Sequence, residues 1–152
     1  MSNKRTTAGS ASNLDLDRQI CHSLYSATNA LVRAYRPLLE QLDLTYPQYL
    51  VMMSLWQRDC VSISALAEHT RFDAGTLSPL LRRVQDKGLI DIQIAEDDER
   101  RKVVKLTRKG RSLKKSAANI PGKIACTANM PTADALQLKA LCEALVKNLA
   151  TP

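Results

Sequence analysis

The sequence predicts a mainly helical domain that carries one small β-hairpin. Long stretches place apolar residues at steps of three and four, beginning with Ile20, Leu24 and Ala27, as the buried stripe of a helix requires. One region instead alternates apolar and polar residues in "LIDIQI" at 89–94, and "KVVKL" at 102–106 follows after a polar tip. Two such runs in succession are typical of paired antiparallel strands.

The chain has 152 residues, which is enough for one domain with its own core. We expect residues 1–13 to form a disordered tail, because "MSNKRTTAGSASN" is polar and lacks the apolar segment of a secretory signal. Residues 14–152 would then form a single domain. No apolar run reaches the roughly 18 residues of a membrane span, so we expect a cytoplasmic protein without membrane contact.

Capping and helix-breaking residues predict the helix limits. Pro47 suits a first helical turn, Ser64 is a good N-cap, and Gly88 suits the left-handed residue that follows a helix. Pro121 and Gly122 should kink or interrupt the long helix before them. The expected helices are 14–42, 47–59, 64–70, 74–87, one from about 107 and one from about 132.

The third and fourth expected helices, joined by "RFD", fit a helix-turn-helix, although an ordinary helical hairpin has the same pattern. The β-hairpin that follows favours a winged helix-turn-helix over about 46–106. Inward residues of the fourth helix should include Leu77, Val84 and either Leu80 or Leu81, while the second helix should turn Leu50, Met53 and Trp56 inward. The candidate DNA-binding residues are Thr76, Ser78, Pro79, Arg82 and Arg83 on the fourth helix and Asp98, Arg100 and Arg101 at the hairpin tip.

The charge distribution agrees with a nucleic-acid partner. The formal net charge is +7, and the segment 100–115 holds basic residues and no acidic one. A solvated basic face is the alternative explanation. Binding to double-stranded DNA would be favoured because phosphate neutralisation releases counterions, and the arginines of the hairpin tip would suit the negative potential of a minor groove.

The outer helices, at about 14–42 and 107–150, carry more apolar surface than a small winged core can cover. The last of them places Leu138, Leu145, Leu149 and either Leu141 or Cys142 on one face. We therefore expect these helices to pack between two chains of a homodimer.

The four cysteines are Cys21, Cys60, Cys126 and Cys142, and none lies in a C-x-x-C pair. The two histidines are scattered, so no metal site and no cofactor are expected. Free cysteine most often packs as a small apolar residue, and this is the interpretation we prefer for Cys60 and Cys142.

The segment "DAGTLSPLLRRVQDKGLI", together with "DDER" and "LTRKGRSL", resembles the MarR family of bacterial transcription regulators over about residues 16–149. These are dimeric winged-helix proteins whose terminal helices form the dimer interface. The resemblance implies an ion pair between Asp98 and Arg100 at the hairpin tip, with Asp97 as the alternative partner.

Within that family, "QICHSLYSATNALVRAYRPLLEQLDLTYPQYLVMMSLW" is similar to the organic hydroperoxide regulators, the OhrR subgroup. This resemblance implies that Cys21 is the redox sensor and that Tyr35 and Tyr46 hold its sulfur, with Tyr25 nearby. Some members resolve the sensor with a second cysteine, and Cys126 has the matching position after a Pro-Gly pair.

Physical chemistry allows a sensor at Cys21, although a packing role is the alternative. The reactive species is the thiolate, which Arg18, expected one turn earlier, and tyrosine hydroxyls would stabilise. Cys21 and Tyr35 are 14 residues apart, about 21 Å along one helix, so they can meet only across a dimer whose first helices run antiparallel.

The tyrosines and methionines near this site also have simpler explanations. The four tyrosines would serve equally as packing residues, an explanation that we prefer for Tyr49. An apolar rim of Leu24, Val32, Met52 and Met53 would favour organic peroxides, but methionine commonly fills a core.

The favoured hypothesis is a DNA-binding repressor that senses organic hydroperoxides through oxidation of Cys21 and then releases its pseudo-palindromic operator. A second hypothesis is a MarR-type repressor that a small aromatic ligand releases. A third is a thiol peroxidase, but an enzyme has no need of a helix built to enter a DNA groove, so we expect the chain not to be an enzyme.

Overall fold

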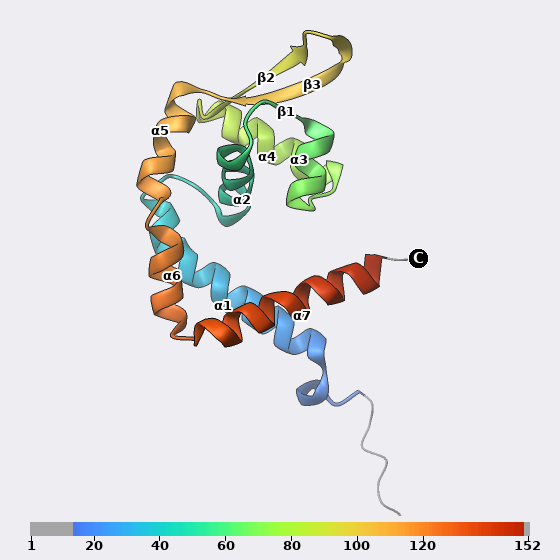
Figure 1. Ribbon diagram of the computed structural model, residues 1–152, viewed down its shortest axis with the longest axis vertical. Helices are drawn as coiled ribbons and strands as arrows, with labels where there is room; N and C mark the ends of the chain where they lie inside the picture. The colour runs from blue at the N-terminus through green and yellow to red at the C-terminus, as the bar shows by residue number, and fades with distance from the viewer. Residues whose placement is uncertain (1–13, 151–152) are drawn as a thin grey trace, which may run out of the picture. The chain divides into compact units, whose positions relative to one another are not determined.

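The computed structural model describes residues 14–150 and is mainly helical, with one small antiparallel sheet (Figure 1). The expected tail at 1–13 lies outside the described residues. Backbone contacts divide the chain into two compact units, one ending at Arg33 and one beginning at Ala34. Among the described helices, none is long and apolar enough to cross a membrane. The elements are η1 (Leu16–Arg18), α1 (Ile20–Glu40), α2 (Tyr46–Gln57), β1 (Val61–Ser62), α3 (Ile63–Thr70), α4 (Ala74–Asp86), β2 (Ile90–Ala95), β3 (Asp98–Leu106), α5 (Arg108–Ala117), α6 (Ile120–Ala128) and α7 (Thr132–Ala150).

The sheet has the strand order β1-β3-β2, and both pairings are antiparallel. Val104 in the central strand pairs with Val61 on one side and Ile92 on the other. The β2–β3 hairpin, called the wing from here on, contains a register shift between Ile94 and Ala95. The predicted hairpin and the mainly helical fold class are therefore confirmed, with β1 as an additional short strand.

Side-chain caps fix where most helices begin. Thr45 and Gln48 form a reciprocal capping box at the start of α2, and Asp73 caps α4. Ser62 caps α3 by accepting a hydrogen bond from the backbone of Ala65, so the predicted cap at Ser64 is wrong. Gly88 has φ of 68°, the left-handed conformation predicted for it.

Two helix limits differ from the expected ones. α1 begins at Ile20, because Gln19 is extended and separates it from the short 3-10 helix η1. The expected interruption of the long helix is present, but it lies at Ala118 and Asn119, before the Pro-Gly pair. Pro121 belongs to the first turn of α6, where a missing backbone N–H costs nothing.

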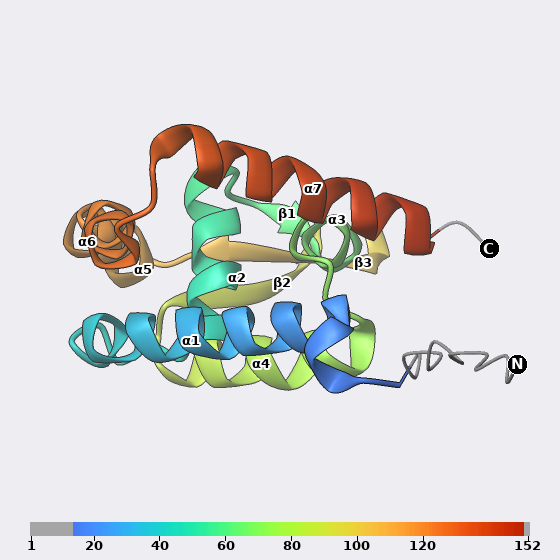
Figure 2. The ribbon, with the colours of Figure 1, turned by 90° about the horizontal axis from the view of Figure 1, so that it is seen from below.

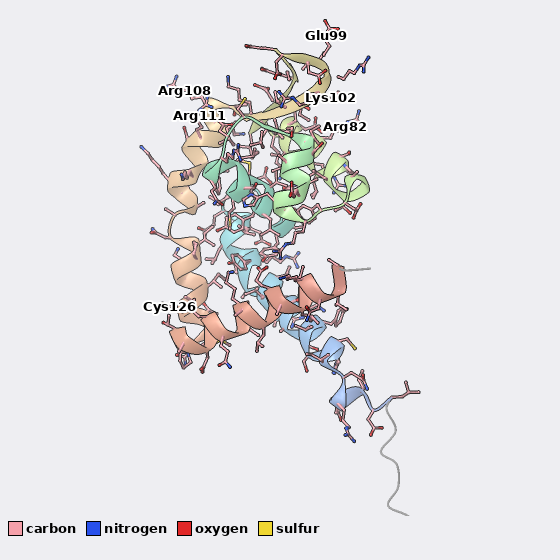
Figure 3. The ribbon with its side chains drawn as sticks, turned by 45° about the vertical axis from the view of Figure 1, so that its right-hand side comes forward. Arg82, Glu99, Lys102, Arg108, Arg111 and Cys126 are labelled. Atoms are coloured by element: carbon pink, nitrogen blue, oxygen red, sulfur yellow. The ribbon has the colours of Figure 1, made fainter. Side chains whose placement is uncertain are left out.

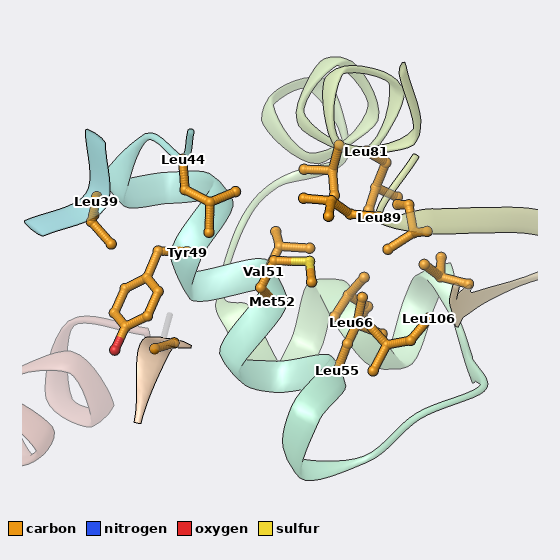
Figure 4. Packing of buried hydrophobic residues seen from close by; sticks show 14 of the residues in the cluster. Leu39, Leu44, Tyr49, Val51, Met52, Leu55, Leu66, Leu81, Leu89 and Leu106 are labelled. Carbon is orange, nitrogen blue, oxygen red and sulfur yellow. The ribbon is translucent and has the colours of Figure 1, made fainter. Parts of the chain in front are cut away.

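The core of the second unit is built around α2, which packs against both α3 and α4 (Figures 2 and 4). Tyr49, Val51, Met52 and Leu55 of this helix are all buried. The predicted inward set of Leu50, Met53 and Trp56 is wrong, since Met53 is 41% exposed and the other two are only partly buried. A helix surrounded on several sides has no single apolar stripe, so its periodicity misleads.

The amphipathic α4 follows its sequence pattern more closely. It buries Leu77 and Val84, and it buries both Leu80 and Leu81, which the sequence left as alternatives. The C-terminal helix α7 instead buries none of its residues. It leaves Leu136, Leu141 and Leu149 more than half exposed.

A close backbone approach joins α5 to the wing. The indole Nε1 of Trp56 donates to the carbonyl of Gly110 at 2.9 Å. A Cβ atom added at Gly110 would lie 2.0 Å from the carbonyl oxygen of Leu89, far inside contact distance. Only glycine therefore allows α5 to start this close to the base of the wing.

We expect Gly110→Ala to lower the free energy of unfolding by about 2 kcal/mol or more, because the clashing atom is backbone and cannot rotate away. Urea unfolding measures the change. Gly122→Ala is the matched control, since an added Cβ there meets nothing within 4 Å. That control should be neutral or gain about 0.5–1 kcal/mol. Equal midpoints for the two variants would contradict the packing argument.

Candidate functional site

The exposed side of α4 carries the residues predicted to read DNA. Ser78, Pro79, Arg82 and Arg83 are all exposed, whereas the opposite side of the helix is buried. Thr76 is exposed as well, but its hydroxyl donates to the Asp73 carboxylate at 2.8 Å and belongs to the helix cap. The same contacts hold the pKa of Asp73 below its usual value. The helix therefore offers a polar, basic face held by a well-capped start.

The tip of the wing has a different ion pair from the one that the resemblance implies. Arg101 binds both carboxylate oxygens of Asp97, at 2.6 and 2.7 Å, and this contact lowers the pKa of Asp97. The Asp98 carboxylate instead accepts the backbone N–H of Arg100 at 2.9 Å, as aspartate often does in turns. The implied ion pair between Asp98 and Arg100 is therefore replaced by Asp97 and Arg101. The guanidinium of Arg100 stays outside that pair.

The basic segment divides into two kinds of side chain. Lys109 donates to the carbonyl of Lys87, Lys114 donates to the carbonyl of Trp56, and Arg111 binds Asp59 and the carbonyl of Leu106. These cations fasten α5 to the winged core, a role that sequence reasoning missed. Lys102 and Arg108 are instead exposed and extend from the wing and from the start of α5 (Figure 3).

Three tyrosines form a cluster between the C-terminal half of α1 and the start of α2. The ring of Tyr35 lies 4.9 Å from that of Tyr46 and 5.7 Å from that of Tyr49, measured between centroids. Burial raises the pKa of all three, and that of Tyr35 reaches about 12. Tyr49 is also a core residue, as predicted, so the tyrosine cluster of Tyr35, Tyr46 and Tyr49 is anchored in the core.

The residues around the candidate sensor thiol lie in the first unit. Cys21 is exposed in the first turns of α1, and Tyr25 is 70% exposed. Arg18 belongs to η1, and the extended Gln19 separates it from α1. The expectation that Arg18 lies one helical turn before Cys21 is therefore wrong.

The other cysteines differ in exposure. Cys126 is exposed on α6 and lines a groove of about 770 Å³ with Pro37, Leu38 and Lys123. Cys142 is partly buried, whereas Cys60 is exposed and has φ of 56°, so core packing does not explain Cys60. Within residues 14–150, no group of three or more histidine, cysteine or acidic side chains could hold a metal ion.

The raised pKa of Tyr35 makes stability depend on pH in the alkaline range. Burial favours the neutral phenol, so its contribution is complete below the ordinary pKa of 10.0 and is lost as pH rises through about 12. We expect Tyr35→Phe to reduce this alkaline loss, measured as the urea midpoint against pH. Tyr25→Phe is the control, because Tyr25 is exposed. An identical alkaline loss in wild type and Tyr35→Phe would contradict the burial argument.

Comparisons with known proteins agree with the arrangement of α3, α4 and the wing. A family model described as transcriptional regulator SarA/Rot matches residues 33–117. The organic hydroperoxide resistance transcriptional regulator of Bacillus subtilis is 36% identical over 136 residues, which cover 90% of this chain and 92% of that protein. The regulator SarZ of Staphylococcus saprophyticus is 32% identical over 124 residues, covering 82% and 85% of the two chains.

Solved structures show the same fold. Reduced AbfR bound to DNA superposes with a TM-score of 0.74 at 24% identity, covering 88% of this chain and 93% of that one. A probable transcriptional regulator from Pseudomonas aeruginosa has a TM-score of 0.76 at 24% identity, covering 86% and 99%. With its winged helix-turn-helix, its family match and its Bacillus relative, this chain belongs to the MarR class of DNA-binding, winged-helix transcriptional regulators.

Proposed function

We propose that this regulator is a homodimeric repressor that senses organic hydroperoxides by oxidation of Cys21. The reduced dimer binds a pseudo-palindromic operator, and the oxidised dimer releases it. The observation that carries the proposal is the 36% identity, along nine-tenths of the chain, to a regulator of organic hydroperoxide resistance. The tyrosine cluster supports it, because the OhrR resemblance assigns Tyr35 and Tyr46 to the sensor sulfur.

The electrostatics of the tyrosine cluster suit this role. Burial raises the pKa of Tyr35 and Tyr46, so both hydroxyls remain protonated donors at physiological pH. Donors directed at a thiolate stabilise the anion and lower the pKa of the thiol. Because Cys21 and Tyr35 are too far apart along one helix to meet, we assign Tyr35 to the Cys21 of the partner subunit, so the sensor would be complete only in the dimer.

Exposed apolar residues supply a surface for that dimer. Leu16, Ile20 and Leu31 are exposed in the first unit, and Leu138 and Leu141 are exposed on α7. Burying apolar surface is the main driving force for subunit association. We propose that these two sets of residues, each on its own unit, face the partner subunit.

The proposed chemistry is a two-step thiol oxidation. The Cys21 thiolate attacks one peroxide oxygen, the O–O bond breaks, and the alkoxide leaves as the alcohol after taking a proton, which leaves a sulfenic acid. A second thiol then condenses with the sulfenic acid, forming a disulfide and releasing water. Cys126 is exposed and therefore accessible for this second step.

A second candidate function has its own structural support. An apolar groove of about 320 Å³ is lined in part by Tyr49, Met53, Trp56 and Pro121. Its size and aromatic lining would suit a small aromatic ligand that releases the repressor without any thiol chemistry. The two candidates differ in whether release requires Cys21.

We expect Cys21→Ser to keep wild-type affinity for promoter DNA next to the protein's own gene and to lose release by cumene hydroperoxide. Serine forms no thiolate at neutral pH and no sulfenic acid. Fluorescence anisotropy with and without peroxide measures both properties. Cys60→Ser is the matched control, an exposed thiol on a different element, and it should respond as wild type does.

The same proteins test whether Cys126 resolves the oxidised thiol, and they test the aromatic-ligand alternative. A non-reducing denaturing gel should show a peroxide-dependent doubled mass in wild type and none in Cys126→Ser. Release of Cys21→Ser by peroxide would refute the sensor. Release of that variant by a phenolic compound alone would favour the aromatic ligand.

The wing should contribute a separable part of DNA binding. We expect Arg100→Ala to weaken operator binding and to reduce the slope of log affinity against log salt by about 1, the loss of one phosphate contact. Arg36→Ala is the control, since Arg36 is an exposed arginine of α1 that pairs with Glu40. Both variants remove one positive charge. An equal change in slope for both would show that the wing makes no specific contact.

A further inference from the structure

The end of the DNA-reading helix is joined to the loop between α1 and α2 by one lysine. Lys87 is the C-cap of α4. Its ammonium group donates to the backbone carbonyl of Asp43 and lies 3.2 Å from the Asp43 carboxylate. It also donates to the side-chain oxygen of Gln48 at 3.2 Å. Only 26% of the Lys87 side chain is exposed, so two oxygens of the loop and one from the first turn of α2 hold a largely buried cation.

The side-chain oxygen of Gln48 that binds Lys87 also accepts a second hydrogen bond. This Oε1 accepts the backbone N–H of Thr45 at 3.1 Å, which closes the capping box of α2. Gln48 is 3% exposed, an unusual position for an amide side chain. One buried oxygen therefore serves both the start of α2 and the ammonium group at the end of α4. A hydrogen bond to an ionised donor is stronger than a neutral one.

The same short segment carries two residues of the tyrosine cluster. Tyr46 directly follows the cap Thr45, and Tyr49 directly follows Gln48. Tyr46 and Tyr49 both contact the ring of Tyr35 on α1. The rings of Tyr46 and Tyr49 are therefore attached to the same segment, from Thr45 to Tyr49, that holds an acceptor of Lys87.

On its other side, Lys87 belongs to the junction of α4 with the wing and α5. Its carbonyl accepts from Lys109 at 2.8 Å, and the carbonyl of the next residue, Gly88, accepts from the hydroxyl of Thr107 at 2.7 Å. Thr107 is the N-cap of α5. The residue that contacts the Thr45–Tyr49 segment is thus also fixed to the start of α5.

We infer that Lys87 is a positioning residue that couples the tyrosine cluster to the recognition helix α4. When oxidation of the sensor thiol shifts the tyrosines, the Thr45–Tyr49 segment moves, and Lys87 transfers the shift to the end of α4. This inference rests on the proposed function. It assigns Lys87 no contact with DNA and no contact with the thiol, only the link between the two sites.

The test compares Lys87→Met with Lys109→Met. Both variants remove one ammonium group near the end of α4, so their general effects on DNA affinity should be alike. Only Lys87 contacts the segment that carries the tyrosines. For each protein, a thiol assay measures the rate of Cys21 oxidation without DNA, and anisotropy measures operator affinity before and after oxidation.

For Lys87→Met we expect a wild-type rate of thiol oxidation and a loss of affinity on oxidation that is at least about 5-fold smaller than in wild type, the lower end of typical allosteric coupling. Lys109→Met should keep the wild-type ratio of oxidised to reduced affinity. If Lys87→Met fails to fold, as judged by urea unfolding, Gln48→Met removes the acceptor instead and should show the same decoupling.

Three results would overturn the inference. One is an unchanged affinity ratio in Lys87→Met, even with a weaker reduced-state affinity, since that pattern means a purely structural role. Another is an equal loss of response in Lys109→Met. The third is a wild-type protein that keeps its affinity after complete oxidation of Cys21, which would refute the proposed function itself and the coupling with it.

Discussion

The burial of α2 is the constraint on which the rest of the second unit depends. This helix buries Tyr49, Val51, Met52 and Leu55. The helices α3 and α4 and the sheet pack around it. Burying an apolar side chain of this size is worth about 1.5–3 kcal/mol, so this helix accounts for much of the stability. Because α3 and α4 are held against one central helix, the exposed side of α4 is supported by a close-packed core.

Charged side chains connect this core to its surroundings mainly through backbone carbonyls. Lys87, Lys109 and Lys114 each donate to a carbonyl that a helix or loop end leaves without a partner. These contacts satisfy polar groups that the elements cannot satisfy themselves. Because these lysines bind carbonyl groups of the protein, a segment rich in basic residues does not present all of its charge to solvent. In this protein the segment divides between cations that hold α5 in place and cations that face solvent.

The sequence was sufficient for the fold class and for the buried side of α4, because an amphipathic helix and an alternating hairpin have distinct periods. It misplaced the buried side of α2, where contacts on several sides erase the period. It also assigned the wrong cap to α3, and the ion pair implied between Asp98 and Arg100 is replaced by one between Asp97 and Arg101. The cap residue and the ion-pair partner each depend on the position of a backbone turn to within one residue. No pattern of residue types specifies that position. The importance of Tyr35 and Tyr46 was implied by family resemblance alone, and their ring contact was not predicted.

Under the proposed function, chemistry in the first unit must reach a surface built in the second. The candidate thiol Cys21 lies in the first turns of α1, whereas the recognition surface is built on α4. Packed helices respond to a small disturbance by moving as units, since a close-packed core is hardly compressible. The C-terminal half of α1 and the start of α2 share the tyrosine cluster, and Lys87, the C-cap of α4, donates a hydrogen bond to Gln48 of α2. Under the proposed function, this series of contacts is the route by which oxidation of Cys21 would alter DNA binding without unfolding either helix.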